Sequence, residues 1–267
     1  KKYFDLYPID EIVLPKVKSD DLDDVPSGGR KLAKARRSDF EKIKNAGRWK
    51  HAVQAYLASI SYADAQIGRV LDALDSSPYA ENTIVLLWSD HGWHLGEKNH
   101  WHKTTLWEEA TRVPFIISAP GMKPARCSKP VSLINIFPTL NELCDLPTID
   151  SHDGVSLVPL LRNTKAAWNH PAIIEYKSGN AAIRSERYRY IRYNDGGEEL
   201  YDLQTDPNEW HNLASNKEHE ALKARLEKWL PKTWAKPAST KKAFDFDPHA
   251  FTWRNKQTGA VVSGSHK

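Results

Sequence analysis

The sequence predicts an α/β fold, in which helices and buried strands form a core and a smaller antiparallel sheet with one helix follows. Three observations support this prediction. Apolar residues recur at a helical period over residues 51–74, two short apolar segments at 83–88 and 113–118 are typical of buried strands, and the segments after about residue 165 are short and partly alternating. A chain of 267 residues can hold one large domain and a small second one.

The helix over residues 51–74 places its apolar side chains on one face, and a Ser-Ser-Pro sequence at 76–78 ends it. The segments at 83–88 and 113–118 are apolar almost throughout, which indicates strands buried on both faces. A long polar loop, rich in His, Trp, Lys and Glu, connects them. Because long loops commonly carry function, this connection is the first place to look for a site.

The C-terminal part of the chain has the pattern of an antiparallel sheet. Gly, Asn and Asp accept positive φ, so the Asn-Asp-Gly-Gly sequence at 194–197 predicts a hairpin turn. An amphipathic helix is expected near residues 222–230, and Pro231 ends it. The strands are predicted at 172–176, 181–184, 188–193 and 199–203.

These patterns divide the chain into three parts. We expect residues 1–165 to belong to the α/β domain, residues 166–235 to form a small α+β subdomain, and residues 236–267 to form a tail of uncertain order.

Charge and cysteine content narrow the class of protein. The 38 Lys and Arg residues against 34 Asp and Glu give a net charge of +4, which is not the pattern of a nucleic-acid-binding protein. Cys127 and Cys144 make neither a disulfide scaffold nor a zinc-binding spacing. No apolar segment is long enough to span a membrane, and the opening residues resemble mid-domain sequence rather than a signal peptide, so we expect a fragment or a processed chain. Acidic residues at 20–24 predict a solvated loop, with calcium binding as the weaker alternative.

A carboxylate and an imidazole, Asp90 and His91, directly follow the first predicted strand. Ligands of open α/β sheets bind at the carboxyl ends of strands, and Gly92 permits a turn that would bring both side chains to one metal ion. Spacing alone also fits a plain strand-end turn with a surface histidine.

The loop that follows contains further groups able to bind anions. His94, Glu97, Lys98, His102 and Lys103 lie within ten residues of one another. A lysine ammonium is a compact cation suited to an oxyanion. The alternative interpretation is an ordinary solvated loop.

An ordered set of motifs in this chain resembles the sulfatase family, in particular its iduronate-2-sulfatase-like and choline-sulfatase-like branch. The resemblance covers about residues 50–215 and implies the C-terminal portion of an alkaline-phosphatase-like α/β/α sandwich. The residues that carry it are WSDHGWHLGEK at 88–98, WHK at 101–103, WEEATRVP at 107–114, YLASISYAD at 56–64, IFPTL at 136–140 and ELYDL with DP at 199–207.

The resemblance implies roles for individual residues. Asp90 and His91 would be ligands of a divalent metal, usually Ca²⁺, and Lys103 would bind a sulfate oxygen and assist the leaving group. His94 and His102 are candidate substrate contacts. The reaction implied is hydrolysis of a sulfate ester of a sugar or small organic molecule, with a formylglycine hydrate attacking sulfur.

The chain departs from the family in one respect. It contains no C/S-x-P/A-x-R motif, and the sequences around Cys127 and Cys144 do not fit it, so no nucleophile is assigned here. We expect a missing N-terminal segment to supply the formylglycine, and that segment or another chain to complete the sheet. We therefore expect the chain alone to be inactive.

Two other functions remain open on the sequence. One is a phosphodiesterase or phosphonate hydrolase of the same superfamily, and the other is a non-catalytic protein that binds anions or carbohydrates. Family resemblance implies a secreted, periplasmic or lysosomal location for the complete protein.

Overall fold

The computed structural model describes residues 1–34, 37–235 and 243–264, and the chain divides into two compact units, Lys1–Lys232 and Thr233–Lys267. The tail expected at 236–267 falls within the second unit, and its residues 236–242 and 265–267 lie outside the described residues. The boundary expected between residues 165 and 166 stays a prediction.

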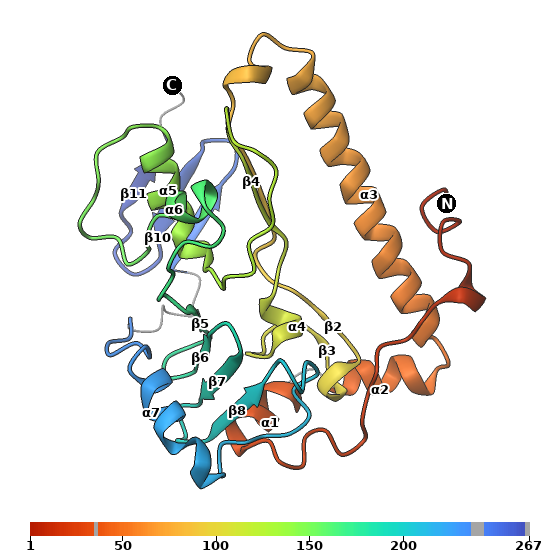
Figure 1. The fold of residues 1–267 in the computed structure, drawn as a ribbon. Coiled ribbons are helices and arrows are strands. Elements are labelled where there is room, and N and C mark those ends of the chain that lie inside the picture. The colour runs from red at the N-terminus through yellow and green to blue at the C-terminus, as the bar shows by residue number, and fades with distance from the viewer. Residues whose placement is uncertain (35–36, 236–242, 265–267) are drawn as a thin grey trace. The chain divides into compact units, whose positions relative to one another are not determined.

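Helices and strands follow the order drawn in Figure 1. The α-helices are α1 Ser27–Lys34, α2 Arg37–Asn45, α3 Trp49–Asp75, α4 Glu108–Thr111, α5 Ile136–Leu143, α6 Val158–Arg162 and α7 Glu220–Glu227. The strands are β1 Val85–Trp88, β2 His94–Leu95, β3 Trp101–His102, β4 Phe115–Ser118, β5 Ala172–Glu175, β6 Ala181–Arg184, β7 Tyr188–Arg192, β8 Glu198–Asp202, β9 Phe244–Asp247, β10 Thr252–Asn255 and β11 Val261–Ser263. Short 3₁₀ helices lie at η1 Ile9–Glu11, η2 Ala80–Asn82, η3 Glu97–Asn99, η4 Leu133–Asn135 and η5 Lys217–His219.

The helix predicted over residues 51–74 is confirmed as α3, the long helix in Figure 1. Val53, at the start of the predicted apolar face, is buried. Ile60 and Val70, on the same face, are 50% and 68% exposed, whereas Ile67 and Leu71 are half-buried. That face is therefore only partly covered within the described residues. No described helix is both long and apolar enough to cross a membrane.

The two predicted core strands are present as β1 and β4, which pair antiparallel from Val85 opposite Ser118 to Trp88 opposite Phe115. The prediction that both strands are buried on both faces is wrong for this structure, because Trp88 is 47% exposed and Ile116 is 55% exposed. The described residues give this ribbon two strands, and a sheet that narrow cannot bury both of its faces.

The predicted antiparallel sheet is confirmed as β5-β6-β7-β8, with each strand paired to the next along the chain. The predicted hairpin turn joins β7 to β8. Tyr193 N donates to the Gly197 carbonyl at 2.9 Å, and Gly196 takes the positive φ of 86° that the turn requires.

Both faces of this sheet are buried. Side chains alternate across a strand, so Tyr190 and Ile191 of β7 lie on opposite faces, and both are fully buried. Tyr190 packs in a cluster with Leu226 of α7. Ile191 packs in a cluster with Leu106 and Trp107, which belong to the connection between β1 and β4. The small sheet therefore supports the connection that carries the predicted site.

A buried carboxylate ties the sheet to that connection. Glu199 of β8 is fully buried and accepts hydrogen bonds from Trp107 Nε1 at 2.7 Å, Tyr193 at 2.6 Å and Tyr201 at 2.5 Å. Burial raises the pKa of Glu199, while its three donors act in the opposite direction. The predicted C-terminal helix is confirmed as α7, although it ends at Glu227, before Pro231.

The second unit contains the antiparallel sheet β9-β10-β11. Phe246 and Trp253 pack with their ring centroids 4.9 Å apart, and Phe251 contacts both rings. Phe246 and Phe251 nevertheless remain 48% and 38% exposed, so the rings form a surface cluster within the described residues of the unit.

Replacing Glu199 with Ala should destabilise the protein by about 3 kcal/mol or more, since three buried donors would lose their acceptor. Chemical denaturation of the purified protein measures the change. Glu186→Ala is the matched control, because the Glu186 side chain is 55% exposed and its pairing with Lys129 is superficial. Equal losses in the two variants would contradict the role given to Glu199.

Candidate active site

The turn after β1 is built by close packing against α4. Gly92 N donates to the Ala110 carbonyl and Trp93 N donates to the Glu109 carbonyl, each at 2.8 Å. A Cβ at position 92 would lie 2.0 Å from the Glu109 carbonyl oxygen, so only glycine allows this approach. Glycine is required at position 92 because a larger side chain would not fit, whereas the sequence suggested that its conformational freedom was needed for a turn.

Asp90, His91 and Lys103 come together at the end of β1. His91 Nδ1 lies 2.9 Å from the Gly92 carbonyl and donates to it, so the lone pair is on Nε2, where it accepts from the Lys103 ammonium. Lys103 Nζ lies 2.7 Å from His91 Nε2, and Asp90 Oδ2 lies 3.5 Å from the same nitrogen. The Asp90 and His91 side chains are 79% and 30% exposed, so a ligand can approach them.

This pair of donors fits part of a metal site. One carboxylate oxygen and one imidazole nitrogen, 3.5 Å apart, can bind the same cation once the Lys103 ammonium moves off the lone pair of that nitrogen. Calcium prefers about six to eight ligands, mostly oxygens, so Asp90 and His91 would make up a fraction of its shell. Across residues 1–34, 37–235 and 243–264, no three His, Cys, Asp or Glu side chains are grouped to hold a metal.

The backbone around Lys103 is strained. Positive φ occurs on both sides of it, at His102 with 92° and at Thr104 with 75°. Earlier in the same loop, Lys98 and Asn99 also have positive φ, of 55° and 49°. Non-glycine residues rarely adopt such angles, and they persist where surrounding contacts impose them, often at functional sites.

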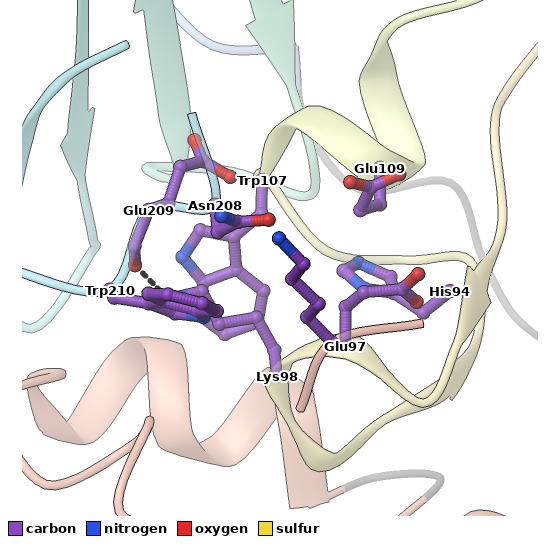
Figure 2. A pocket seen from close by; sticks show the side chains of 9 residues that line it. His94, Glu97, Lys98, Trp107, Glu109, Asn208, Glu209 and Trp210 are labelled. Carbon is purple, nitrogen blue, oxygen red and sulfur yellow. Dashed lines mark hydrogen bonds between the residues drawn. The ribbon is translucent and has the colours of Figure 1, made fainter. Parts of the chain in front are cut away.

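Lys98 imposes this conformation from inside the protein. Its side chain is 2% exposed, and its ammonium donates to Asp21 Oδ1 at 2.7 Å and to the Glu209 carbonyl oxygen. The same ammonium lies 5.5 Å and 5.1 Å from the ring centroids of Trp107 and Tyr201. Figure 2 draws the hydrogen bond from Lys98 to Glu209 as a dashed line, beside the rings of Trp107 and Trp210. Its loop is therefore not the plain solvated loop that the sequence also allowed.

Asp21 likewise corrects the prediction for the acidic cluster at residues 20–24. The Asp21 side chain is 2% exposed, and burial raises its pKa even though Lys98 acts to lower it. The cluster is thus not a purely solvated loop, since one of its carboxylates is a buried partner of Lys98.

The other end of the loop is held by Arg189 of β7, whose side chain is 1% exposed. It donates to the Leu106 carbonyl at 2.8 Å and to the Glu108 carboxylate, and its Nε forms an ion pair with Glu209 Oε1 at 2.8 Å. Burial raises the pKa of Glu209 to about 7, although Arg189 acts to lower it. Burial also opposes ionisation of Glu108, but Arg189 and Arg184 hold the Glu108 pKa below its ordinary value.

The two other predicted histidines occupy different environments. His94 is fully buried, and its Nε2 lies 2.7 Å from the Thr105 hydroxyl. With no exposed surface it cannot meet a substrate, so we leave His94 out of the proposed contacts. His102 remains a candidate, since its side chain is 29% exposed and its Nε2 lies 3.1 Å from Asp39 Oδ2. His100, also buried, contacts the Lys103 carbonyl through Nε2 at 3.0 Å and so helps to place that lysine.

Several residues that shape the site were not predicted. Asp39 belongs to the basic N-terminal region, where nothing in the sequence marks it, and Arg189 sits in a strand whose alternation is only partial. Glu209 follows the Asp-Pro motif by two residues, which was a usable signal. Their roles depend on contacts between residues far apart in the chain.

Comparison with known proteins places this geometry in a class. A solved 2-O GAG sulfatase superposes with a TM-score of 0.65 and 28% identity, covering 81% of this chain and 51% of that chain. A phosphonate monoester hydrolase from Silicibacter pomeroyi shares the fold, with a TM-score of 0.72 at 24% identity over 85% of this chain and 51% of that chain. The protein therefore has the α/β fold of the alkaline-phosphatase-like class.

Sequence comparison narrows the class to a family. The family model described as "Sulfatase" matches residues 19–146. A second family model, described as "N-sulphoglucosamine sulphohydrolase, C-terminal", matches residues 96–236, and this second match covers more than half of the chain. The chain belongs to the sulfatase family, as its motifs predicted.

Two curated relatives of this chain are named as sulfatases. A sulfatase from Formosa agariphila is 43% identical over 235 residues, which is 87% of this chain and 46% of the relative. Choline-sulfatase from Rhizobium meliloti is 32% identical over 225 residues, which is 81% of this chain and 43% of the relative. The chain thus spans less than half the length of these two proteins.

The buried imidazole of His94 predicts a pH dependence of stability. Burial lowers its pKa well below the ordinary value, and nearby His100 and Lys98 add to the effect. In the unfolded chain the imidazole titrates near about 6.5. Unfolding therefore takes up a proton below that pH, and His94 lowers the free energy of unfolding as the solution becomes more acidic.

His94→Phe should cost stability at pH 7.5, and this cost should shrink by up to about 1.4 kcal/mol per pH unit below about 6.5. Urea denaturation at several pH values measures the gap between variant and wild type. Thr105→Val is the control, because it removes the same hydrogen bond but keeps the imidazole. A gap for His94→Phe that stays constant down to pH 5 would rule out this assignment.

Proposed function

We propose that this chain is the sulfate-holding part of a sulfuric ester hydrolase. The observation that carries the proposal is the convergence of the Lys103 ammonium, the His91 imidazole and the Asp90 carboxylate at the end of β1. An ammonium placed there can bind a sulfate oxygen, and it can donate to the alcohol oxygen as the sulfur–oxygen bond breaks. The strained, braced loop keeps Lys103 in place, so little reorganisation is needed during the reaction.

The proposal assigns a divalent metal, Ca²⁺, to Asp90 and His91. These partly exposed side chains supply one carboxylate and one imidazole lone pair, which the Lys103 ammonium would give up to the ion, and the remaining ligands would come from outside this chain. When bound, the ion neutralises negative charge on the sulfate oxygens.

The nucleophile in this proposal is a formylglycine supplied by an N-terminal segment or another chain, since no C/S-x-P/A-x-R motif is present here. Its hydrate oxygen would form a bond to sulfur while the bond from sulfur to the alcohol oxygen breaks, and the alcohol would leave with a proton. The same segment would cover α3 and extend the β1–β4 ribbon. The exposed Ile60, Val70 and Ile116 side chains and the shorter span of this chain relative to its relatives support this.

The proposed substrate is the sulfate ester of a sugar or of a small organic alcohol. The names of the relatives support both classes, since one is a choline-sulfatase and another a 2-O GAG sulfatase. A secreted, periplasmic or lysosomal location is proposed for the complete protein from its family alone. The second candidate activity is hydrolysis of a phosphonate monoester, favoured by the fold shared with the Silicibacter pomeroyi enzyme.

Assays of the complete protein that contains this chain separate these functions. We expect release of sulfate from choline sulfate or a sulfated monosaccharide to be faster than hydrolysis of a phosphonate monoester under the same conditions. A preference for the phosphonate would favour the second function. Absence of turnover on all three, with retained binding of inorganic sulfate, would indicate a non-catalytic anion-binding protein.

Substitutions in the site test the roles of its residues. In the complete protein, Lys103→Ala should lower kcat/KM for the sulfate ester by about 100-fold or more, as expected for loss of a preplaced cation. Asp90→Ala should abolish calcium binding, measured by calorimetry, together with activity. Asp150→Ala, at an exposed carboxylate in the loop after α5, is the control. Normal calcium affinity in Asp90→Ala would remove Asp90 from the metal site.

A further inference from the structure

We propose that Trp93, His102 and Asp39 form a subsite for the sugar ring that carries the sulfate ester. This inference rests on the proposed sulfatase function and specifies its substrate class. It follows from the position of the Trp93 indole beside the imidazoles of His91 and His102, and from the polar pair that His102 forms with Asp39.

The indole of Trp93 lies beside two imidazoles. Its ring centroid is 6.4 Å from that of His91, with the planes inclined by 33°, and 4.7 Å from that of His102, with the planes inclined by 68°. His91 Nε2 is the atom that Lys103 contacts. The indole therefore lies beside the imidazole that the Lys103 ammonium contacts.

The polar pair is held at the protein surface. His102 Nε2 lies 3.1 Å from Asp39 Oδ2, and the two side chains are 29% and 33% exposed. The other Asp39 oxygen lies 3.9 Å from the ammonium of Lys42, in the same helix α2. Positive φ at His102 takes the backbone out of regular strand geometry, which places the imidazole beside Asp39 and Trp93.

These groups match the chemistry of a sugar ring. A pyranose has a face of C–H groups, which packs on an indole, and a rim of hydroxyls, which need both donors and acceptors. The carboxylate of Asp39 accepts and the imidazole of His102 can donate or accept. Binding sites for small polar ligands commonly combine an aromatic surface with a few fixed polar groups.

The alternative ligand for Trp93 is the quaternary ammonium of choline, which aromatic rings also bind. The pairing of Asp39 argues against it. The Asp39 carboxylate, which a bound cation would need, is already paired with His102 at 3.1 Å and with the Lys42 ammonium at 3.9 Å. A neutral, hydroxyl-bearing ring needs no free carboxylate and can exchange hydrogen bonds with this pair.

The test compares substrates in the complete protein. The quantity measured is the ratio of kcat/KM for a sulfated monosaccharide, either 2-O- or 6-O-sulfated, to kcat/KM for choline sulfate. We expect the wild type to favour the sugar, and Trp93→Ala and His102→Gln each to lower the ratio by about 10-fold or more. Trp93→Phe keeps an aromatic face, so this variant should retain most of the wild-type preference for the sugar.

The chain offers a matched control. Trp168 and His170 form a similar edge-to-face pair on the surface, with centroids 5.0 Å apart and planes inclined by 61°. His170→Gln should leave the substrate ratio unchanged. The proposal is overturned if the wild type favours choline sulfate, if Trp93→Ala lowers turnover of both substrates equally, or if the ratio does not change in either variant.

Binding measurements separate this proposal from the proposed function. Calorimetry on protein without the converted formylglycine should show the sulfated monosaccharide binding at least about 10-fold more tightly than inorganic sulfate. Trp93→Ala and His102→Gln should each lower the affinity for the sulfated monosaccharide to that for inorganic sulfate. The affinity for inorganic sulfate should stay unchanged. If this pattern appears in a protein that hydrolyses no sulfate ester, the subsite stands and the sulfatase function fails. Equal affinity of the wild type for the two ligands refutes the subsite even where sulfate is released.

Discussion

The buried ammonium of Lys98 fixes the loop on which the candidate site is built. Burying a charge is costly unless partners replace the lost water. Lys98 finds those partners in Asp21, in the Glu209 carbonyl and in the ring faces of Trp107 and Tyr201, which come from three separate parts of the chain. Moving Lys98 would leave the buried Asp21 carboxylate without its cation, so the loop has one favourable arrangement.

Arg189 fixes the same loop at its other end. It holds the Leu106 carbonyl and the Glu108 carboxylate, and it shares Glu209 with the Lys98 anchor. Lys103 lies between these two anchors, on a backbone that bends through positive φ on both sides of it. The small C-terminal sheet thus acts as the base on which the anion-binding lysine is mounted, and the cost of the strained backbone is offset by buried ion pairs.

The same unit that holds this loop firmly leaves other apolar surfaces open. The second half of α3 and the β1–β4 ribbon expose large aliphatic and aromatic side chains, whereas both faces of the β5–β8 sheet are covered. The exposed apolar part is where the additional segment of the proposed function would pack.

Local pattern determined the long helix α3, the four strands of the small sheet and the turn at Gly196, because periodicity and glycine conformation act over a few residues. It also placed Asp90 and His91 at a strand end, and the motifs identified the family. Local pattern could not distinguish His94, which is buried, from His102, which is partly exposed, since both lie in one polar loop.

The tertiary structure decided which polar groups of that loop face inward. Lys98 and Lys103 are the same residue type five positions apart, yet one is buried and the other exposed. The difference comes from Asp21 and Glu209, which approach from distant positions in the sequence. Whether a charge is buried depends on the partners that the fold brings to it, and no property of the residue or its neighbours in sequence specifies them.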